Sequence, residues 1–179
     1  MYFPCMLSAL SFFKTYFIMK IIDYTFLPNG LIQIRLIGNQ VLLVRRDVNS
    51  GKLITRSKVR TLSGVQHTGI WLGSEYHTGR SLIMHNHYQF GTAHISTYQD
   101  YALGQQVYFK GGRCVNDPSK VLQIALAEAK AGKPYDVILY NCQHFTSRAC
   151  NNVHFSEDLA KWGAGLFGLA FIALLAGGF

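Results

Sequence analysis

The chain has few cysteines and few acidic residues, and each shortage excludes some classes of protein. Its four cysteines, Cys5, Cys114, Cys142 and Cys150, form no C-x-x-C pair, which argues against a zinc ribbon or a thioredoxin-like motif. Four cysteines in 179 residues are also too sparse for a disulfide framework, so we expect a reducing compartment in which a catalytic thiol stays free. A chain of this length can form one globular domain with a core and short appendages.

Acidic residues number 9 against 17 lysines and arginines, which gives a formal net charge of +8. Six of the basic residues lie within 45–60, opposed by Asp47 alone: Arg45, Arg46, Lys52, Arg56, Lys58 and Arg60. Such a cluster fits the phosphates of nucleic acid or of anionic lipid headgroups, although a solvated basic hairpin explains it equally well. No nucleic-acid-binding motif accompanies it, so we expect no nucleic-acid partner and favour lipid phosphate.

The two ends of the chain are apolar but differ in pattern. Residues 1–22 are interrupted by Lys14 and Lys20 and lack a basic region ahead of the apolar stretch, so a secretory signal is poorly supported. They are either an extension outside the folded domain or a membrane-associated segment. Residues 162–179 carry no charge and as a helix would span about 27 Å, close to the thickness of bilayer hydrocarbon. We therefore expect a C-terminal membrane-anchor helix at 160–179, with a buried C-terminal helix as the alternative.

Between these ends the pattern changes from strands to helices. Strands are expected over 31–37, 40–45, 67–72, 81–87 and 106–110. Asp117 as N-cap and Pro118 at the first helical position predict a helix that Gly132 ends, and residues 135–140 are expected to run extended into a second helix beginning at Cys142. This order predicts an α+β fold over residues 23–155, with a mainly antiparallel sheet packed with helices.

Residues 140–145, Tyr-Asn-Cys-Gln-His-Phe, carry the strongest chemical signal. A helix that begins at Cys142, capped by Asn141, directs its unpaired N–H groups and its positive dipole end at the sulfur. This placement favours the thiolate, which is the nucleophilic form of cysteine, although a lone cysteine is more commonly a small buried hydrophobe. His144 is expected to be structural, because residues two apart on a helix point away from each other.

Two histidines on neighbouring predicted strands can supply the missing base. On adjacent antiparallel strands, His67 and His85 could lie opposite each other and face the helix that carries Cys142. A Cys–His pair with a third group that orients the imidazole is the general arrangement for thiol acyl transfer. His87 shares a strand face with His85, and we favour His85 as the third member.

A zinc site is the rival interpretation, with His85, His87 and Cys142 as ligands. No carboxylate or further histidine stands at a supporting interval, so we expect neither a metal nor another cofactor. His94 and His154 are expected in surface or loop positions.

The segment 67–73, His-Thr-Gly-Ile-Trp-Leu-Gly, is followed by His85 and much later by Asn-Cys-Gln-His-Phe. This combination resembles the lecithin:retinol acyltransferase-like family over roughly residues 65–151. That family is similar to permuted papain-like enzymes, and it includes small phospholipase A/acyltransferases with a C-terminal membrane anchor. The resemblance therefore implies a permuted papain-like fold for the catalytic domain.

The resemblance also implies roles for individual residues: Cys142 as the acyl-accepting nucleophile, His67 as general base and His85 as its orienting group. Gln143 stands where many animal members carry Glu, a change that we expect to matter little because glutamine can still reach back to backbone donors at the cap. The backbone N–H of Cys142 is the expected oxyanion donor.

The function implied is that of a membrane-associated thiol acyltransferase or phospholipase A-type enzyme. It would move a fatty acyl group from a glycerophospholipid through a Cys142 thioester to an acceptor or water. The expected partners are a phospholipid substrate and an anionic membrane surface, with the catalytic domain on the cytoplasmic side of a C-terminal tail anchor. Two alternatives stay open, a papain-like cysteine amidase or peptidase and a catalytically idle, membrane-tethered interaction module. The sequence indicates neither the acyl acceptor nor the oligomeric state.

Overall fold

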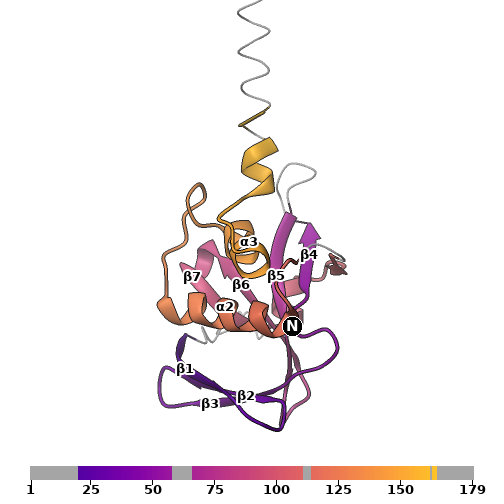
Figure 1. Ribbon diagram of the computed structural model, residues 1–179, viewed down its shortest axis with the longest axis vertical. Coiled ribbons are helices and arrows are strands. Elements are labelled where there is room, and N and C mark those ends of the chain that lie inside the picture. Colours follow the sequence, from indigo (N-terminus) through magenta and orange to yellow (C-terminus); the bar gives the residue numbers. More distant parts are fainter. Residues whose placement is uncertain (1–19, 58–65, 111–113, 162, 165–179) are drawn as a thin grey trace, which may run out of the picture.

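The computed structural model describes residues 20–57, 66–110, 114–161 and 163–164. Its strands are β1 (Ile21–Phe26), β2 (Leu31–Leu36), β3 (Val41–Arg45), β4 (Leu53–Ser57), β5 (Gln66–Glu75), β6 (Ser81–His87), β7 (Thr92–Thr97) and β8 (Tyr108–Phe109). Its helices are the 3-10 turn η1 (Tyr88–Phe90), α1 (Tyr98–Ala102), α2 (Pro118–Ala131) and α3 (Cys142–Asn151) (Figure 1). The predicted α+β class, with an antiparallel sheet packed with helices, is confirmed.

The sheet is organised around β5. Its strand order is β1-β2-β3-β5-β4-β8, and β6 pairs with both β5 and β7. Each pairing between these strands is antiparallel. The long β5 changes partners along its length, with β4 beside its beginning and β3 beside Ser74 and Glu75. Gly73 precedes that junction at φ +135°, where a Cβ would lie 2.4 Å from the carbonyl oxygen of Arg45. Glycine is therefore required for β3 and β5 to approach each other here.

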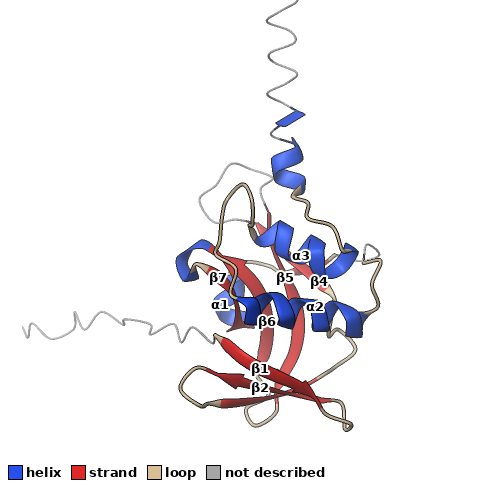
Figure 2. Cartoon of the chain, turned by 60° about the vertical axis from the view of Figure 1, so that its left-hand side comes forward, coloured by secondary structure: helices blue, strands red, loops and turns tan. Residues whose placement is uncertain are grey.

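Helices α2 and α3 pack together over one face of this sheet (Figure 2). The predicted boundaries of α2 are confirmed: Asp117 caps it, Pro118 opens it, and Gly132 ends it at φ +64°. Its apolar stripe is buried in the main core and consists of Val121, Leu122, Ala125, Leu126 and Ala129. A smaller cluster, built around Ile54, Ile83 and Tyr101, lies on the other face of the sheet, because neighbouring strand residues alternate between faces.

The structure differs from the sequence prediction at the N-terminal border of the domain. The domain was expected to begin at residue 23, but β1 begins at Ile21, whose side chain is 3% exposed and belongs to the main core. Within the described ranges, no helix combines the length and apolarity needed to cross a bilayer. The predicted anchor at 160–179 lies largely outside those ranges.

Several elements were not predicted. They are β1, β4, η1, β7 and α1. Residues 135–140 were expected to be extended, but Asp136 and Tyr140 instead close a turn by pairing with each other. The reason is local, because the Asp136 carboxylate accepts hydrogen bonds from two N–H groups inside that turn.

Cys114 and Cys150 form a disulfide that joins the segment before α2 to the end of α3. This bridge joins residues 36 positions apart and was not predicted; it removes one argument for a reducing compartment. Among the residues that the structure describes, the free cysteine is Cys142.

Candidate active site

His67 and His85 are in direct contact at the beginning of β5 and near the end of β6. Nε2 of His67 lies 2.9 Å from Nδ1 of His85, and Nε2 of His85 lies 3.0 Å from the hydroxyl oxygen of Ser96 in β7. Both histidines are 3% exposed. Their predicted proximity is confirmed, and Ser96 extends the pair into a buried chain of three side chains.

Two arrangements of protons satisfy the chain Ser96–His85–His67. In the first, Nε2–H of His67 donates to His85, and Nε2–H of His85 donates to Ser96. Nδ1 of His67 then carries no proton, as a general base requires. The second arrangement reverses both hydrogen bonds and leaves the proton on Nδ1 of His67. The first arrangement is the one that a thiol–imidazole mechanism can use.

Burial lowers the pKa of His85 well below its ordinary value, and the charges of neighbouring histidines, His94 first, lower it further. His85 is therefore neutral when the site is at rest. A neutral His85 can fix the tautomer and orientation of His67 through a hydrogen bond. It supplies no negative charge for the imidazolium, unlike the carboxylate of a Ser–His–Asp triad.

His87, the competing third member, has a different role in the structure. Its Nδ1 accepts a hydrogen bond from the backbone N–H of Gln89 at the start of η1. Its ring centre still lies 5.3 Å from that of His67, but the nitrogen 2.9 Å from Nε2 of His67 belongs to His85. Within the part of the chain that the structure describes, no three His, Cys, Asp or Glu side chains are grouped as metal ligands.

Cys142 is the first residue of α3, as predicted, and the cap before it is fully formed. Oδ1 of Asn141 accepts hydrogen bonds from the N–H groups of Gln143 and His144, at 2.9 and 3.2 Å. Nδ1 of His144 in turn accepts from the N–H of Asn141 at 3.2 Å. Asn141 and His144 thus form a capping box, which confirms the structural role predicted for His144.

Gln143 does not reach back to the cap, so that prediction is wrong. Its Oε1 accepts hydrogen bonds from the hydroxyl of Ser156 and the backbone N–H of Asp158, both at 2.8 Å. The side chain therefore ties the start of α3 to the segment that follows this helix. His144 occupies the capping position instead, because it is the third residue of α3.

Cys142 is 1% exposed but belongs to neither hydrophobic cluster of the core. Its carbonyl oxygen accepts a hydrogen bond from Oγ1 of Thr68 at 3.0 Å, and Thr68 follows His67 in β5. The start of α3 and the start of β5 therefore meet at the same end of the molecule. Because the residue is almost fully covered, an ester carbonyl can reach its sulfur only if neighbouring groups move.

Arg56 and Tyr101 are site residues that the sequence analysis missed. The Tyr101 hydroxyl donates to the carbonyl oxygen of His67 at 2.8 Å. Nε of Arg56 donates to the carbonyl oxygen of Tyr101, and the guanidinium carbon lies 5.4 Å from the centre of the Tyr101 ring. Arg56 pairs in register with His67, but β4 was not predicted, so no sequence signal could place it here.

Electrostatics connect these two residues to Cys142. Burial lowers the pKa of Arg56, and negative charge on Tyr101 or Cys142 opposes that effect. Burial raises the pKa of Tyr101, while Arg56 opposes this rise and a charged Cys142 adds to it. A guanidinium that is 3% exposed thus lies within electrostatic reach of the sulfur, where it can stabilise negative charge that develops during a reaction.

The predicted basic cluster is not one continuous surface. Arg56 is buried beside His67, the Arg45 guanidinium lies 4.9 Å from the centre of the Tyr76 ring, and Arg46 lies over Phe26. Lys58 and Arg60 lie outside the described residues.

His94 was expected at the surface, but it is 2% exposed in β7. It pairs in register with His85, and the ring centres of the two side chains are 4.3 Å apart. Burial lowers the pKa of His94 to about 4. His154 is exposed, as predicted, and its ring stacks on that of His144.

The folded protein should lose stability as pH falls from about 6.5 towards 4. An unfolded histidine has a pKa near ~6.5, whereas His94 in the fold has a pKa of about 4. The unfolded state therefore binds the proton more tightly, and protonation in this interval favours unfolding. The pKa difference corresponds to about 3 kcal/mol, fully lost below pH ~4. Guanidinium unfolding between pH 7.5 and 4 measures the change.

Carboxylates also titrate in this range, so His94→Gln serves as the reference. The variant cannot bind the proton at this position, and its free energy of unfolding should fall less steeply with decreasing pH. Equal slopes in the two proteins would show that His94 is not responsible.

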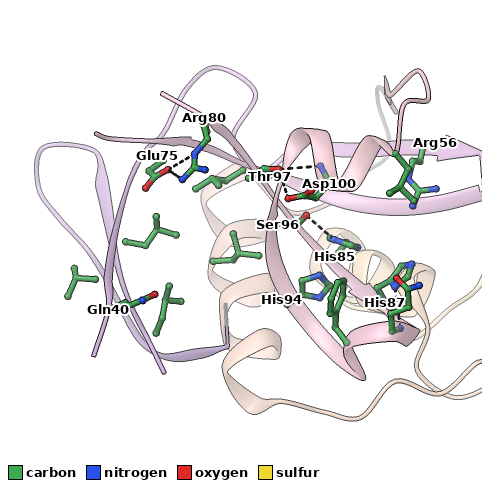
Figure 3. A pocket seen from close by; sticks show the side chains of 18 residues that line it. Gln40, Arg56, Glu75, Arg80, His85, His87, His94, Ser96, Thr97 and Asp100 are labelled. Atoms are coloured by element: carbon green, nitrogen blue, oxygen red, sulfur yellow. Dashed lines mark hydrogen bonds and ion pairs between the residues drawn. The ribbon is translucent and has the colours of Figure 1, made fainter. Parts of the chain in front are cut away.

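A pocket of about 690 Å³ reaches the histidine chain from the side of Ser96 (Figure 3). His85, His87 and His94 contribute to its wall, whereas Cys142 is not among the described residues that line it. The pocket thus reaches the third member of the predicted triad and not the sulfur. The contacts made by Cys142 and by His67 define the candidate site better than the pocket does, because the sequence predicts the nucleophile at the sulfur.

Comparison with known proteins supplies no relative. No family model, curated protein or solved structure matches this chain. Its function therefore has to follow from the chemistry of the residues gathered around Cys142.

Proposed function

We propose that this protein is a membrane-associated thiol acyltransferase or phospholipase A-type enzyme, similar to the lecithin:retinol acyltransferase-like family and with a permuted papain-like fold. One observation carries the proposal. A free cysteine stands at the capped beginning of a helix, beside a strand whose histidine belongs to a buried Ser–His–His chain. The histidines precede the cysteine in the chain, as in the permuted order.

In the first half-reaction, His67 takes the proton of the Cys142 thiol, and the sulfur attacks the ester carbonyl of a glycerophospholipid. The carbon–oxygen bond of the ester breaks, and His67 returns the proton to the departing lysophospholipid oxygen. In the second half-reaction, His67 takes a proton from an alcohol, an amine or water, which attacks the thioester carbonyl. The carbon–sulfur bond then breaks, and the thiolate regains the proton.

The surroundings of the sulfur support these roles. Asn141 accepts hydrogen bonds from the N–H groups of Gln143 and His144, so the cap does not use the N–H of Cys142. That group can donate to the oxyanion of the tetrahedral intermediate. The buried guanidinium of Arg56 lies within electrostatic reach of the sulfur and adds positive charge there. His85 keeps His67 oriented while the proton moves.

The decisive experiment detects the acyl-enzyme. Purified protein incubated with mixed phospholipid vesicles and quenched in acid should gain the mass of one fatty acyl group, and hydroxylamine should remove it. Cys142→Ala should show no adduct, whereas Cys5→Ala, which keeps the candidate nucleophile, should show it. An adduct with peptide esters or amides but not with lipids would favour the amidase or peptidase alternative. No adduct with either substrate class would favour an idle interaction module.

A further inference from the structure

The turn just before Cys142 exposes three consecutive large apolar side chains. Val137, Ile138 and Leu139 are 64%, 66% and 66% exposed. Single exposed apolar residues are ordinary, but adjacent ones on a projecting turn commonly mark an interaction surface. Cys142 follows Leu139 after two residues, so whatever the turn contacts is brought close to the candidate nucleophile.

The turn is held in a shape that keeps these side chains outside. Oδ1 of Asp136 accepts hydrogen bonds from the N–H groups of Ile138 and Leu139, at 2.8 and 2.7 Å. The backbones of Asp136 and Tyr140 pair at both ends of the turn, at 3.1 and 2.9 Å. The N–H groups of Leu139 and Ile138 lower the pKa of Asp136, so the carboxylate that organises the turn persists at neutral pH. The apolar tip is thus presented on a fixed frame and is not a loose loop.

A second exposed apolar segment lies beside this tip. Val153 and Phe155 are 50% and 48% exposed. The side-chain amide of Asn141 connects the two segments, because its Nδ2 donates to the carbonyl oxygen of Val137 at 2.9 Å and to the hydroxyl of Ser156 at 3.3 Å. The residue that caps the nucleophile helix therefore also holds the two apolar segments together.

The chain continues from the same end of the molecule. The turn before α3 and the segment after α3 both rise towards the end where the final helical residues leave the domain (Figures 1 and 2). From residue 162 onwards the sequence carries no charge. Lys133 and Lys161 are exposed and stand before and after these two segments in the chain, and Nζ of Lys133 lies 4.3 Å from the centre of the Tyr140 ring at the base of the turn. Apolar tips with basic flanks are typical of surfaces that enter the boundary between lipid headgroups and acyl chains.

We propose that Val137, Ile138 and Leu139, together with Val153 and Phe155, form the surface by which this protein enters a phospholipid bilayer. Its purpose rests on the proposed function, since this contact brings lipid esters to Cys142. The occupant is a membrane and not a protein groove, because the tip is a narrow projection flanked by lysines and adjoins the uncharged end of the chain.

Tryptophan fluorescence with brominated lipids tests the contact without any reference to catalysis. In the full chain, Ile138→Trp adds one indole at the tip, and Val48→Trp adds one at a site that is 86% exposed in the β3–β4 connection. After subtraction of the wild-type signal, vesicles with bromines near the headgroups should quench most of the added Ile138→Trp emission and little of the Val48→Trp emission. Equal quenching of the two, or an Ile138→Trp emission already shielded without vesicles, would overturn the proposal.

A second measurement separates this inference from the proposed function. The variant with both Ile138→Ser and Leu139→Ser should lower the ratio of Cys142 acylation by vesicle phospholipid to acylation by a soluble short-chain ester at least about tenfold, since two apolar anchors are lost. Val48→Ser should leave the ratio unchanged. Quenching at the tip without any acylation would uphold the membrane surface and refute the enzyme, whereas acylation with an unchanged ratio would refute the membrane surface alone.

Discussion

Replacing His67 by glutamine should slow the acylation of Cys142 by about 10²- to 10⁴-fold, because a positioned general base contributes that much to a proton transfer. Glutamine is close in size and can still donate to Nδ1 of His85, so the partner 2.9 Å away keeps a hydrogen bond. The variant therefore removes the base with limited disturbance of the chain. The measurement is the rate of acyl-enzyme formation with a soluble short-chain ester, followed by intact mass, with the thermal unfolding midpoint as a check on folding.

His77→Gln is the matched control, because His77 is exposed in the β5–β6 connection and should not change the rate. His85→Gln distinguishes base from orienting group. It should lower the rate less than His67→Gln does, because the proposed base itself remains in place. A His67→Gln rate within a factor of two of wild type would refute the assignment of His67 as base.

Replacing Phe145 by alanine should lower the free energy of unfolding by about 3–5 kcal/mol. Phe145 is 0% exposed and belongs to the main core, so the substitution leaves a cavity as well as removing buried apolar surface. Urea or guanidinium unfolding, compared with wild type at pH 7.5, measures the change. Phe155→Ala provides the control, since Phe155 is 48% exposed and its truncation should cost much less.

A loss below about 1 kcal/mol for Phe145→Ala would mean that the helix is not packed as described. The comparison matters for the active site because Phe145 fixes the position of α3 on the sheet. We therefore expect Phe145→Ala to lose activity in proportion to the fraction of protein that is unfolded, while the folded fraction keeps its chemistry at the sulfur. Acylation measured well below the unfolding midpoint should therefore fall less in Phe145→Ala than in His67→Gln.

The six-residue motif that begins at Tyr140 thus divides into separate physical roles. Asn141 and His144 cap the helix, Phe145 anchors it in the core, and Gln143 holds the following segment. Cys142 has none of these structural roles and is the proposed nucleophile. The motif places the sulfur at the start of α3 through local bonds, which explains why the position of Cys142 could be predicted from the sequence.

Local signals determined much of this protein before any tertiary contact was known. Asp117, Pro118 and Gly132 specified both ends of α2, and Asn141 specified the start of α3, because caps and left-handed terminators act over a few residues. The strand β6 had its predicted limits for the same reason, since its composition and the turn residues around it are local. The contact between His67 and His85 could also be predicted, because it required only the assumption that their two strands are neighbours in the sheet.

Tertiary structure alone decided which distant residues meet at and near the candidate site. Arg56 looked like one more surface charge until β4 paired with β5 and buried it beside His67. His94 and Ser96 entered the site through the pairing of β7 with β6, and Cys114 met Cys150 only when α2 and α3 packed together. Sequence patterns report what each segment prefers for itself, whereas the pairing and packing of separate segments determine burial, proton positions and the charge near a reactive atom.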